Sequence, residues 1–131
     1  MLGFSRVSSS LVCLALGACS APSAADTFVS LESERGLLEA EVRVETPVAR
    51  GDNQLFVTLR PHAEHGVARL LAVDASMAAH AHQAHAQTID ESVDGFHVSE
   101  LDLFMTGRWL VVLELLVEGQ SDSVSLPVDV P

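Results

Sequence analysis

The chain has 131 residues, of which 48% are hydrophobic and 19% charged, and its formal net charge at pH 7 is −11. An acidic surface of this kind repels phosphate backbones, which argues against nucleic-acid binding. Both cysteines, Cys13 and Cys19, come before residue 20, so the segment that follows has no disulfide, thiol nucleophile or thiolate ligand, and its length suits one domain with a hydrophobic core.

The first residues have the layout of a secretory signal. One positive charge, Arg6, precedes an apolar run from Val7 to Leu16, and small residues follow. The run is about ten residues long, whereas a transmembrane helix needs roughly 20. The segment Leu16-Gly17-Ala18-Cys19 resembles the lipobox of bacterial lipoproteins, in which the cysteine is lipidated and becomes the first residue. An ordinary signal peptide cleaved between Ala21 and Ala25 is the alternative.

The lipobox resemblance divides the chain into three parts. It implies a lipoprotein signal peptide over residues 1–18, a lipidated cysteine with a flexible linker over 19–26, and a folded domain over 27–131. Acyl chains on Cys19 would tether this domain to a membrane of the cell envelope, on its extracytoplasmic (periplasmic) face. A membrane, reached through the lipid anchor, is therefore one predicted partner.

Beyond the linker the dominant pattern is the alternation of apolar and polar residues that is typical of β-strands. Leu38, Ala40 and Val42 alternate with Glu39 and Glu41, for example. The more continuous apolar run from 67 to 75 suggests a strand covered on both faces. The strands expected in this half are 28–34, which turns at Arg35-Gly36 into 38–45, then 55–61 and 67–75.

The C-terminal part continues the pattern after an Asp94-Gly95 turn. The strands expected here are 96–105, 109–118 and 124–130, with turns at Thr106-Gly107 and Gly119–Asp122. Pro127 places the last strand at a sheet edge. Trp109 is expected in the core, with its indole N–H bonded to a carbonyl. About seven short strands without a helical stripe predict an all-β, antiparallel, two-sheet sandwich.

Residues 77–86 interrupt the alternation, and the alanine-rich segment from Ala72 to Ala86 is expected to form a loop or a single helical turn. Met77, His80 and His82 lie close together there, and His85 follows. Histidines two apart lie on the same side of an extended chain, so His80 and His82 could share one ion. A thioether beside imidazoles suits copper, whereas three imidazoles alone would equally suit zinc. A His- and Ala-rich loop without any bound ion is the alternative.

Two residues of the strand over 96–105 have two interpretations each. His97 shares a predicted face with Leu101 and Leu103, so it is either a core histidine bonded to a backbone group or a ligand near the Met77–His82 segment. Met105 is either packing or a second thioether ligand. The candidate metal site is therefore Met77, His80, His82, Met105, His97 and His85.

From about residue 46 to 130 the chain resembles the YtkA-like family, which is related to FixH-like extracytoplasmic domains. The resemblance lies in a Met-x-x-His-x-His segment, an Asp-Gly turn and a Met-x-Gly-x-Trp segment, with His97 where the family usually has an aromatic residue. These segments are Met77 to His82, Asp94-Gly95, and Met105, Gly107 and Trp109. The resemblance implies an immunoglobulin-like β-sandwich and a link to copper handling or respiratory-oxidase assembly.

Catalysis has little support, because the sequence has no Gly-x-Ser-x-Gly elbow, phosphate-binding glycine loop or His-Glu-x-x-His helix. The first hypothesis is a non-enzymatic lipoprotein that binds copper and delivers it to an envelope or respiratory protein. The alternative is a metal-free sandwich that binds another cell-envelope protein through a sheet edge or a loop.

Overall fold

The computed structural model describes residues 27–45, 47–64 and 66–131. The predicted signal peptide over 1–18, Cys19 and the whole linker up to residue 26 lie outside these residues, as do Thr46 and His65. Nothing in the described ranges forms a helix that could span a bilayer.

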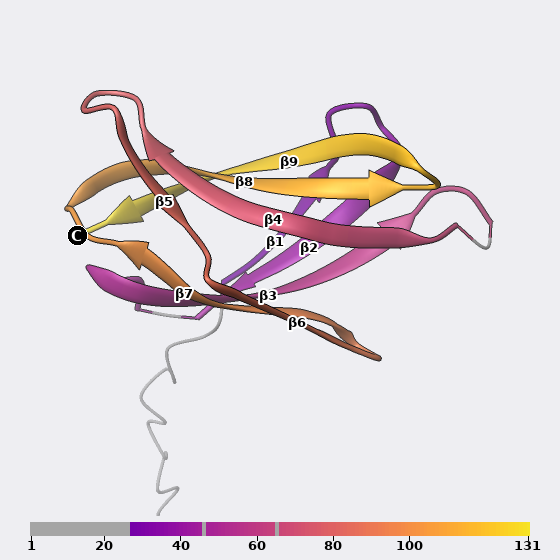
Figure 1. The fold of residues 1–131 in the computed structure, drawn as a ribbon, viewed down its shortest axis with the longest axis horizontal. Coiled ribbons are helices and arrows are strands. Elements are labelled where there is room, and N and C mark those ends of the chain that lie inside the picture. Colours follow the sequence, from indigo (N-terminus) through magenta and orange to yellow (C-terminus); the bar gives the residue numbers. More distant parts are fainter. Residues whose placement is uncertain (1–26, 46, 65) are drawn as a thin grey trace, which may run out of the picture.

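The described residues form an all-β sandwich of two antiparallel sheets, as predicted (Figure 1). The five-stranded sheet has, in spatial order, β1 (Thr27–Glu32), β2 (Leu38–Val44), β3 (Gly51–Pro61), β7 (Gly95–Leu103) and β6 (Thr88–Ser92). The four-stranded sheet has β5 (His82–His85), β4 (Ala68–Met77), β8 (Gly107–Val117) and β9 (Gln120–Val130).

The strand order is that of an immunoglobulin-like sandwich. The order β2-β3-β7-β6 corresponds to strands A-B-E-D, and β5-β4-β8-β9 corresponds to C′-C-F-G, with β1 as an additional edge strand. The described residues contain nine strands where about seven were expected, because β5 and β6 were not foreseen. The prediction of a loop or helical turn over 72–86 is wrong, since β4 runs to Met77 and β5 pairs with it after a four-residue turn over 78–81.

The core lies between the two sheets and is built from the apolar positions of the alternating strands. On β2 the buried residues are Leu38, Ala40, Val42 and Val44, and the intervening side chains are partly exposed. The largest side chain that is buried completely is Trp109, whose exposed fraction is 0%. β9 is an edge strand, as Pro127 predicted.

A β-bulge in β7 overturns the predicted face of His97. Asn53 of β3 pairs with Leu101 and Leu55 pairs with Val98, so two β7 residues lie opposite a single β3 residue, and Glu100 has a φ of 57°. In a regular strand, residues three apart point to opposite faces. The extra residue of the bulge shifts this pattern by one, so that residues three apart across it point to the same face. Val98 and Leu101 therefore both enter the core, and His97 faces outward with its side chain only partly buried.

A second irregularity lies in β4, whose apolar run is covered on one face only. The pairing with β8 shifts between Leu70 and Ala72. Leu70 is buried, whereas Leu71 is 51% exposed. The run therefore belongs to a strand with one core face and one outer face, and the expectation of a doubly covered strand is wrong.

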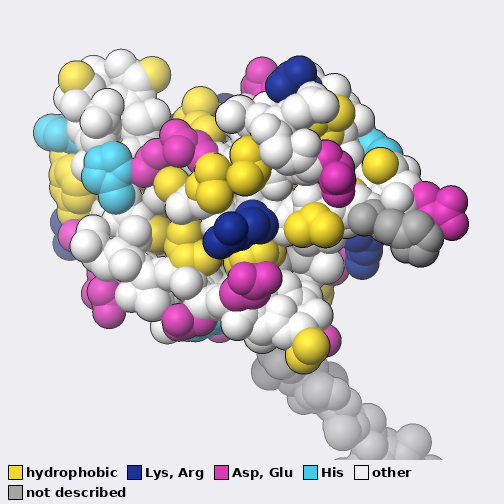
Figure 2. Space-filling view, turned by 45° about the vertical axis from the view of Figure 1, so that its right-hand side comes forward, with side chains coloured by type: hydrophobic (Ala, Val, Ile, Leu, Met, Phe, Trp, Pro, Cys, Tyr) yellow, Lys and Arg dark blue, Asp and Glu magenta, His cyan; other side chains and the backbone are white. Residues whose placement is uncertain are grey.

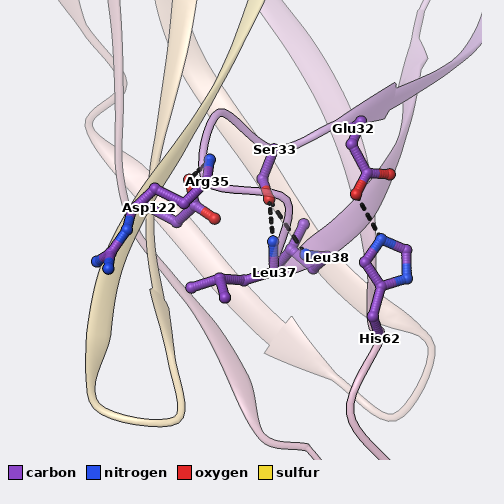
Figure 3. A network of polar contacts seen from close by, with 7 residues as sticks. All are labelled: Glu32, Ser33, Arg35, Leu37, Leu38, His62 and Asp122. Atoms are coloured by element: carbon purple, nitrogen blue, oxygen red, sulfur yellow. Dashed lines mark hydrogen bonds and ion pairs between the residues drawn. The ribbon is translucent and has the colours of Figure 1, made fainter.

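One polar network ties the β1–β2 turn to β9 (Figure 3). Ser33 is buried, and its hydroxyl oxygen accepts hydrogen bonds from the backbone N–H groups of Leu37 and Leu38. Asp122 is also buried, and its carboxylate accepts the N–H groups of Arg35 at 2.9 Å and Ser123 at 2.8 Å. These bonds satisfy backbone groups that would otherwise be buried without partners where the two sheets meet.

Candidate metal centre

Met77 and His82 are direct neighbours across the β4–β5 pair. Met77 is the last residue of β4, His82 is the first of β5, and the register places them opposite one another. Side chains in such a position have Cβ atoms about 4.5–5.5 Å apart. Both lie on the inner side of the sheet, because Met77 is 4% exposed, His82 is half-buried and Ala84, two residues on, is buried. A thioether and an imidazole are thus brought together at the end of the sandwich.

His80 joins this pair from the turn. Its backbone N–H donates to the carbonyl of Met77 at 3.2 Å, and Ala81 has a φ of 51°, so the chain is not extended between the two histidines. The rings of His80 and His82 nevertheless have centroids 5.9 Å apart and planes inclined by 30°. Two imidazoles that bind one ion through nitrogens about 2.0 Å from it have ring centres roughly 5–6 Å apart. The observed spacing is compatible with a shared ion.

The β7–β8 connection packs against this hairpin at the same end of the sandwich (Figure 1). The Phe104 ring meets the His82 ring edge-on at 5.4 Å and the Trp109 ring edge-on at 5.3 Å. Phe104 is 41% exposed, so it shields one side of His82 from solvent while remaining at the surface. Sequence reasoning missed this residue, because no periodicity distinguishes an aromatic side chain in a turn.

Met105 lies in the same connection. It is half-buried against the core, and its carbonyl accepts the indole N–H of Trp109 at 3.0 Å, which confirms the hydrogen bond predicted for that indole. The packing interpretation of Met105 is supported by this position. Because Met105 follows Phe104, it lies at the same end of the sandwich as the β4–β5 hairpin. A role of Met105 as a metal ligand stays a prediction.

Two other predicted ligands are not brought to the Met77–His82 cluster. His85 is exposed on the outer side of β5, where its Nδ1 contacts the carboxylate of Asp74, its register partner on β4. His97 lies on the outer face of the five-stranded sheet, and its Nε2 is 3.0 Å from Oε1 of Gln54. The core interpretation of His97 is wrong, because its ring is half-exposed and its partner is a side chain.

The donor set that the structure assembles is therefore small. Among the described residues, no group of three or more His, Cys, Asp or Glu side chains could hold a metal ion. The cluster instead consists of two imidazoles and one thioether. Figure 2 shows histidine side chains at the end of the molecule that carries the β4–β5 turn, with acidic side chains close by.

An acidic hollow borders Phe104. Its volume is about 440 Å³, and the carboxylates of Asp52, Glu100 and Asp102 line it together with Gln83 and Phe104. Asp52 and Asp102 are opposite one another in the β3–β7 register, and both are exposed. Negative charge of this kind raises the local concentration of cations. The hollow therefore favours the approach of a metal ion to this end of the sandwich.

Comparison of the chain with family models, with curated proteins and with solved structures gave no match.

Proposed function

We propose that this protein binds a copper ion through Met77, His80 and His82, and passes it to an envelope or respiratory protein. The observation that carries the proposal is the pairing of Met77 with His82 across β4 and β5, with the His80 ring 5.9 Å from the His82 ring. Thioether sulfur together with imidazole nitrogen is a donor combination that favours copper over harder ions. Zinc is the alternative ion, although two imidazoles are fewer ligands than its sites ordinarily have.

The exposure of His80 supports delivery of the ion to another protein over its permanent storage. His80 is exposed in the turn and His82 is half-buried, whereas Met77 is buried in the core. An acceptor could thus reach the ion from the His80 side without unfolding the sandwich. The immunoglobulin-like strand order agrees with what the YtkA-like resemblance implies, and membership of that family is part of this proposal.

Copper titration tests the proposal. The protein should bear serine at positions 13 and 19, because thiolates bind copper more tightly than thioethers and would mask the site. In mild detergent, with competing chelators, this protein should bind one copper ion. Changing His80 and His82 together to alanine should weaken binding by more than about tenfold. Binding should also weaken as the pH is lowered, because protons compete with the metal ion for the imidazole nitrogens.

The matched control is the double variant His62→Ala and His97→Ala. His62 contacts Glu32 at 2.5 Å and His97 contacts Gln54, both away from the hairpin, so copper affinity should not change. Copper binding that survives the loss of His80 and His82, or that is lost equally in the control, would contradict the proposed site.

We also propose that Cys19 is lipidated and holds the domain at the extracytoplasmic face of a membrane. Changing Cys19 to alanine should release the protein from the membrane fraction or leave its precursor uncleaved. Changing Cys13 to alanine, inside the proposed signal peptide, should have no effect. Mass spectrometry of the mature protein checks both, and an unmodified N-terminus beyond residue 19 would refute the anchor.

A metal-free interaction module is the second candidate. It is favoured by Leu71 and Leu110, which are 51% and 43% exposed on the outer face of the four-stranded sheet. Leu110 pairs with Ser76, about five residues along β4 from Leu71, so the two side chains would contact a partner at separate points of this face. A protein that takes up no copper in the titration, and whose association with an envelope partner is lost when both leucines become serine, would favour this function.

A further inference from the structure

The β7–β8 connection touches the proposed metal ligands from outside the hairpin that carries them. Gly107, at the start of β8, lies against the end of the Met77 side chain: a Cβ atom at position 107 would be 2.7 Å from Met77 Cε. Gly107 also has a φ of 127°, a conformation that other residues adopt at a cost. The space that the Met77 methyl group occupies therefore exists because residue 107 has no side chain.

Any larger residue at 107 would displace Met77 first. The atom in the way is the far end of a flexible thioether side chain, which can rotate, whereas Met77 is confined on its other sides by the core, with an exposed fraction of 4%. Its sulfur is next to the displaced methyl group, so a shift of that group moves the sulfur relative to His82.

The donor set also discriminates between ions. Zinc takes four ligands in tetrahedral sites, and Cu(II) prefers tetragonal sites of nitrogen and oxygen ligands. Soft thioether sulfur selects Cu(I), and within the described residues the two histidines have no third His, Cys, Asp or Glu with which to complete a site. Phe104 covers one side of His82 and limits access of water on that side.

We infer that the ion bound here is Cu(I), and that Gly107 is a positioning residue which selects it by holding the Met77 thioether beside His82. The inference rests on the proposed copper site. It assigns to Gly107 a role that requires no contact with the ion: Gly107 acts through Met77 alone. In a protein that lacks the thioether, the size of residue 107 should therefore not affect metal binding.

A double-mutant cycle tests this in the full-length, cysteine-free protein in mild detergent, with Cu(I), Cu(II) and Zn(II) as probes. Met77→Leu conserves the side-chain volume and should weaken Cu(I) binding by about tenfold or more, with affinities for Cu(II) and Zn(II) changed much less. Gly107→Ala should weaken Cu(I) binding by itself and should add nothing in the Met77→Leu background. X-ray absorption should detect a copper–sulfur distance in the starting protein and lose it in both single variants.

The outcomes separate the inference from the function on which it rests. No copper binding by the starting protein would overturn both. Copper binding that requires His80 and His82 but is equally tight with Leu at 77 would overturn the inference alone. If Gly107→Ala weakens Cu(I) binding equally in proteins with Met77 and with Met77→Leu, Gly107 does not act through the thioether, and its positioning role is overturned. Should Gly107→Ala fail to fold by circular dichroism, Met77→Leu with its loss of the copper–sulfur signal still decides whether the thioether selects Cu(I).

Discussion

Replacing Trp109 with alanine is expected to lower the free energy of unfolding by about 3–5 kcal/mol. The indole is 0% exposed near the start of β8, and truncation removes its apolar contacts and leaves a cavity between the sheets. The hydrogen bond from its N–H to the Met105 carbonyl, 3.0 Å long, is lost as well, together with the edge-on contact to Phe104. A loss of this size is a large fraction of the stability of a small domain.

Urea unfolding followed by circular dichroism measures this loss without relying on the fluorescence of the residue that is removed. The midpoint should fall while the slope of the transition stays the same, because the surface exposed on unfolding is nearly unchanged. Leu110→Ala is the matched control. Leu110 is the next residue on the same strand, but it is 43% exposed on the outer face, and its loss should cost less than about 1 kcal/mol. Similar costs for the two variants would contradict the position of Trp109 in the core.

Replacing Asp122 with alanine is expected to cost about 1–3 kcal/mol at pH 7, because it leaves the N–H groups of Arg35 and Ser123 without their acceptor in a partly buried place. Burial by itself raises the pKa of this carboxyl. Hydrogen bonds from the Arg35 N–H, the Ser33 hydroxyl and the Ser123 N–H outweigh burial, so the pKa of Asp122 lies below its usual value.

The lowered pKa of Asp122 predicts the pH at which this contribution disappears. A carboxyl whose pKa is lower in the folded than in the unfolded state stabilises the fold at every pH above the unfolded value of about 3.9. The stabilisation is lost as the pH falls below that value and through the folded pKa of Asp122. The difference between the Asp122→Ala variant and the original protein should therefore be largest at neutral pH and shrink towards pH 3.

The control for Asp122 is Asp129→Ala on the same strand. Asp129 is paired with Arg108 at 3.1 Å, but both side chains are more than 70% exposed, and pairs exposed to this degree contribute little to stability. Urea midpoints at pH 7 and pH 3 check both variants. A cost for Asp122→Ala that is the same at both pH values would show that the ionised form of the carboxylate does not stabilise the fold.

The sequence by itself determined the class of fold and most of its strands. Period-two alternation is a local property, because successive side chains of a strand point to opposite faces wherever the strand lies. The hairpin of β1 and β2, the turn at Asp94-Gly95 and the edge position of β9 follow from such local signals and are confirmed. The core position of Trp109 is confirmed as well. Its indole hydrogen bond is also confirmed, since a buried indole N–H needs an acceptor such as a backbone carbonyl.

The tertiary structure alone decided which predicted site residues meet. The bulge that turns His97 outward appears in the sequence only as a change of parity, from Phe96 and Val98 to Leu101 and Leu103, and the register between β3 and β7 is what makes it a bulge. The pairing of Met77 with His82 depends on where β5 begins, and the contacts of Phe104 and Gly107 join segments brought together only by the docking of the two sheets. Residue types indicate which chemistry a segment can support, but register and sheet packing decide which side chains share a site.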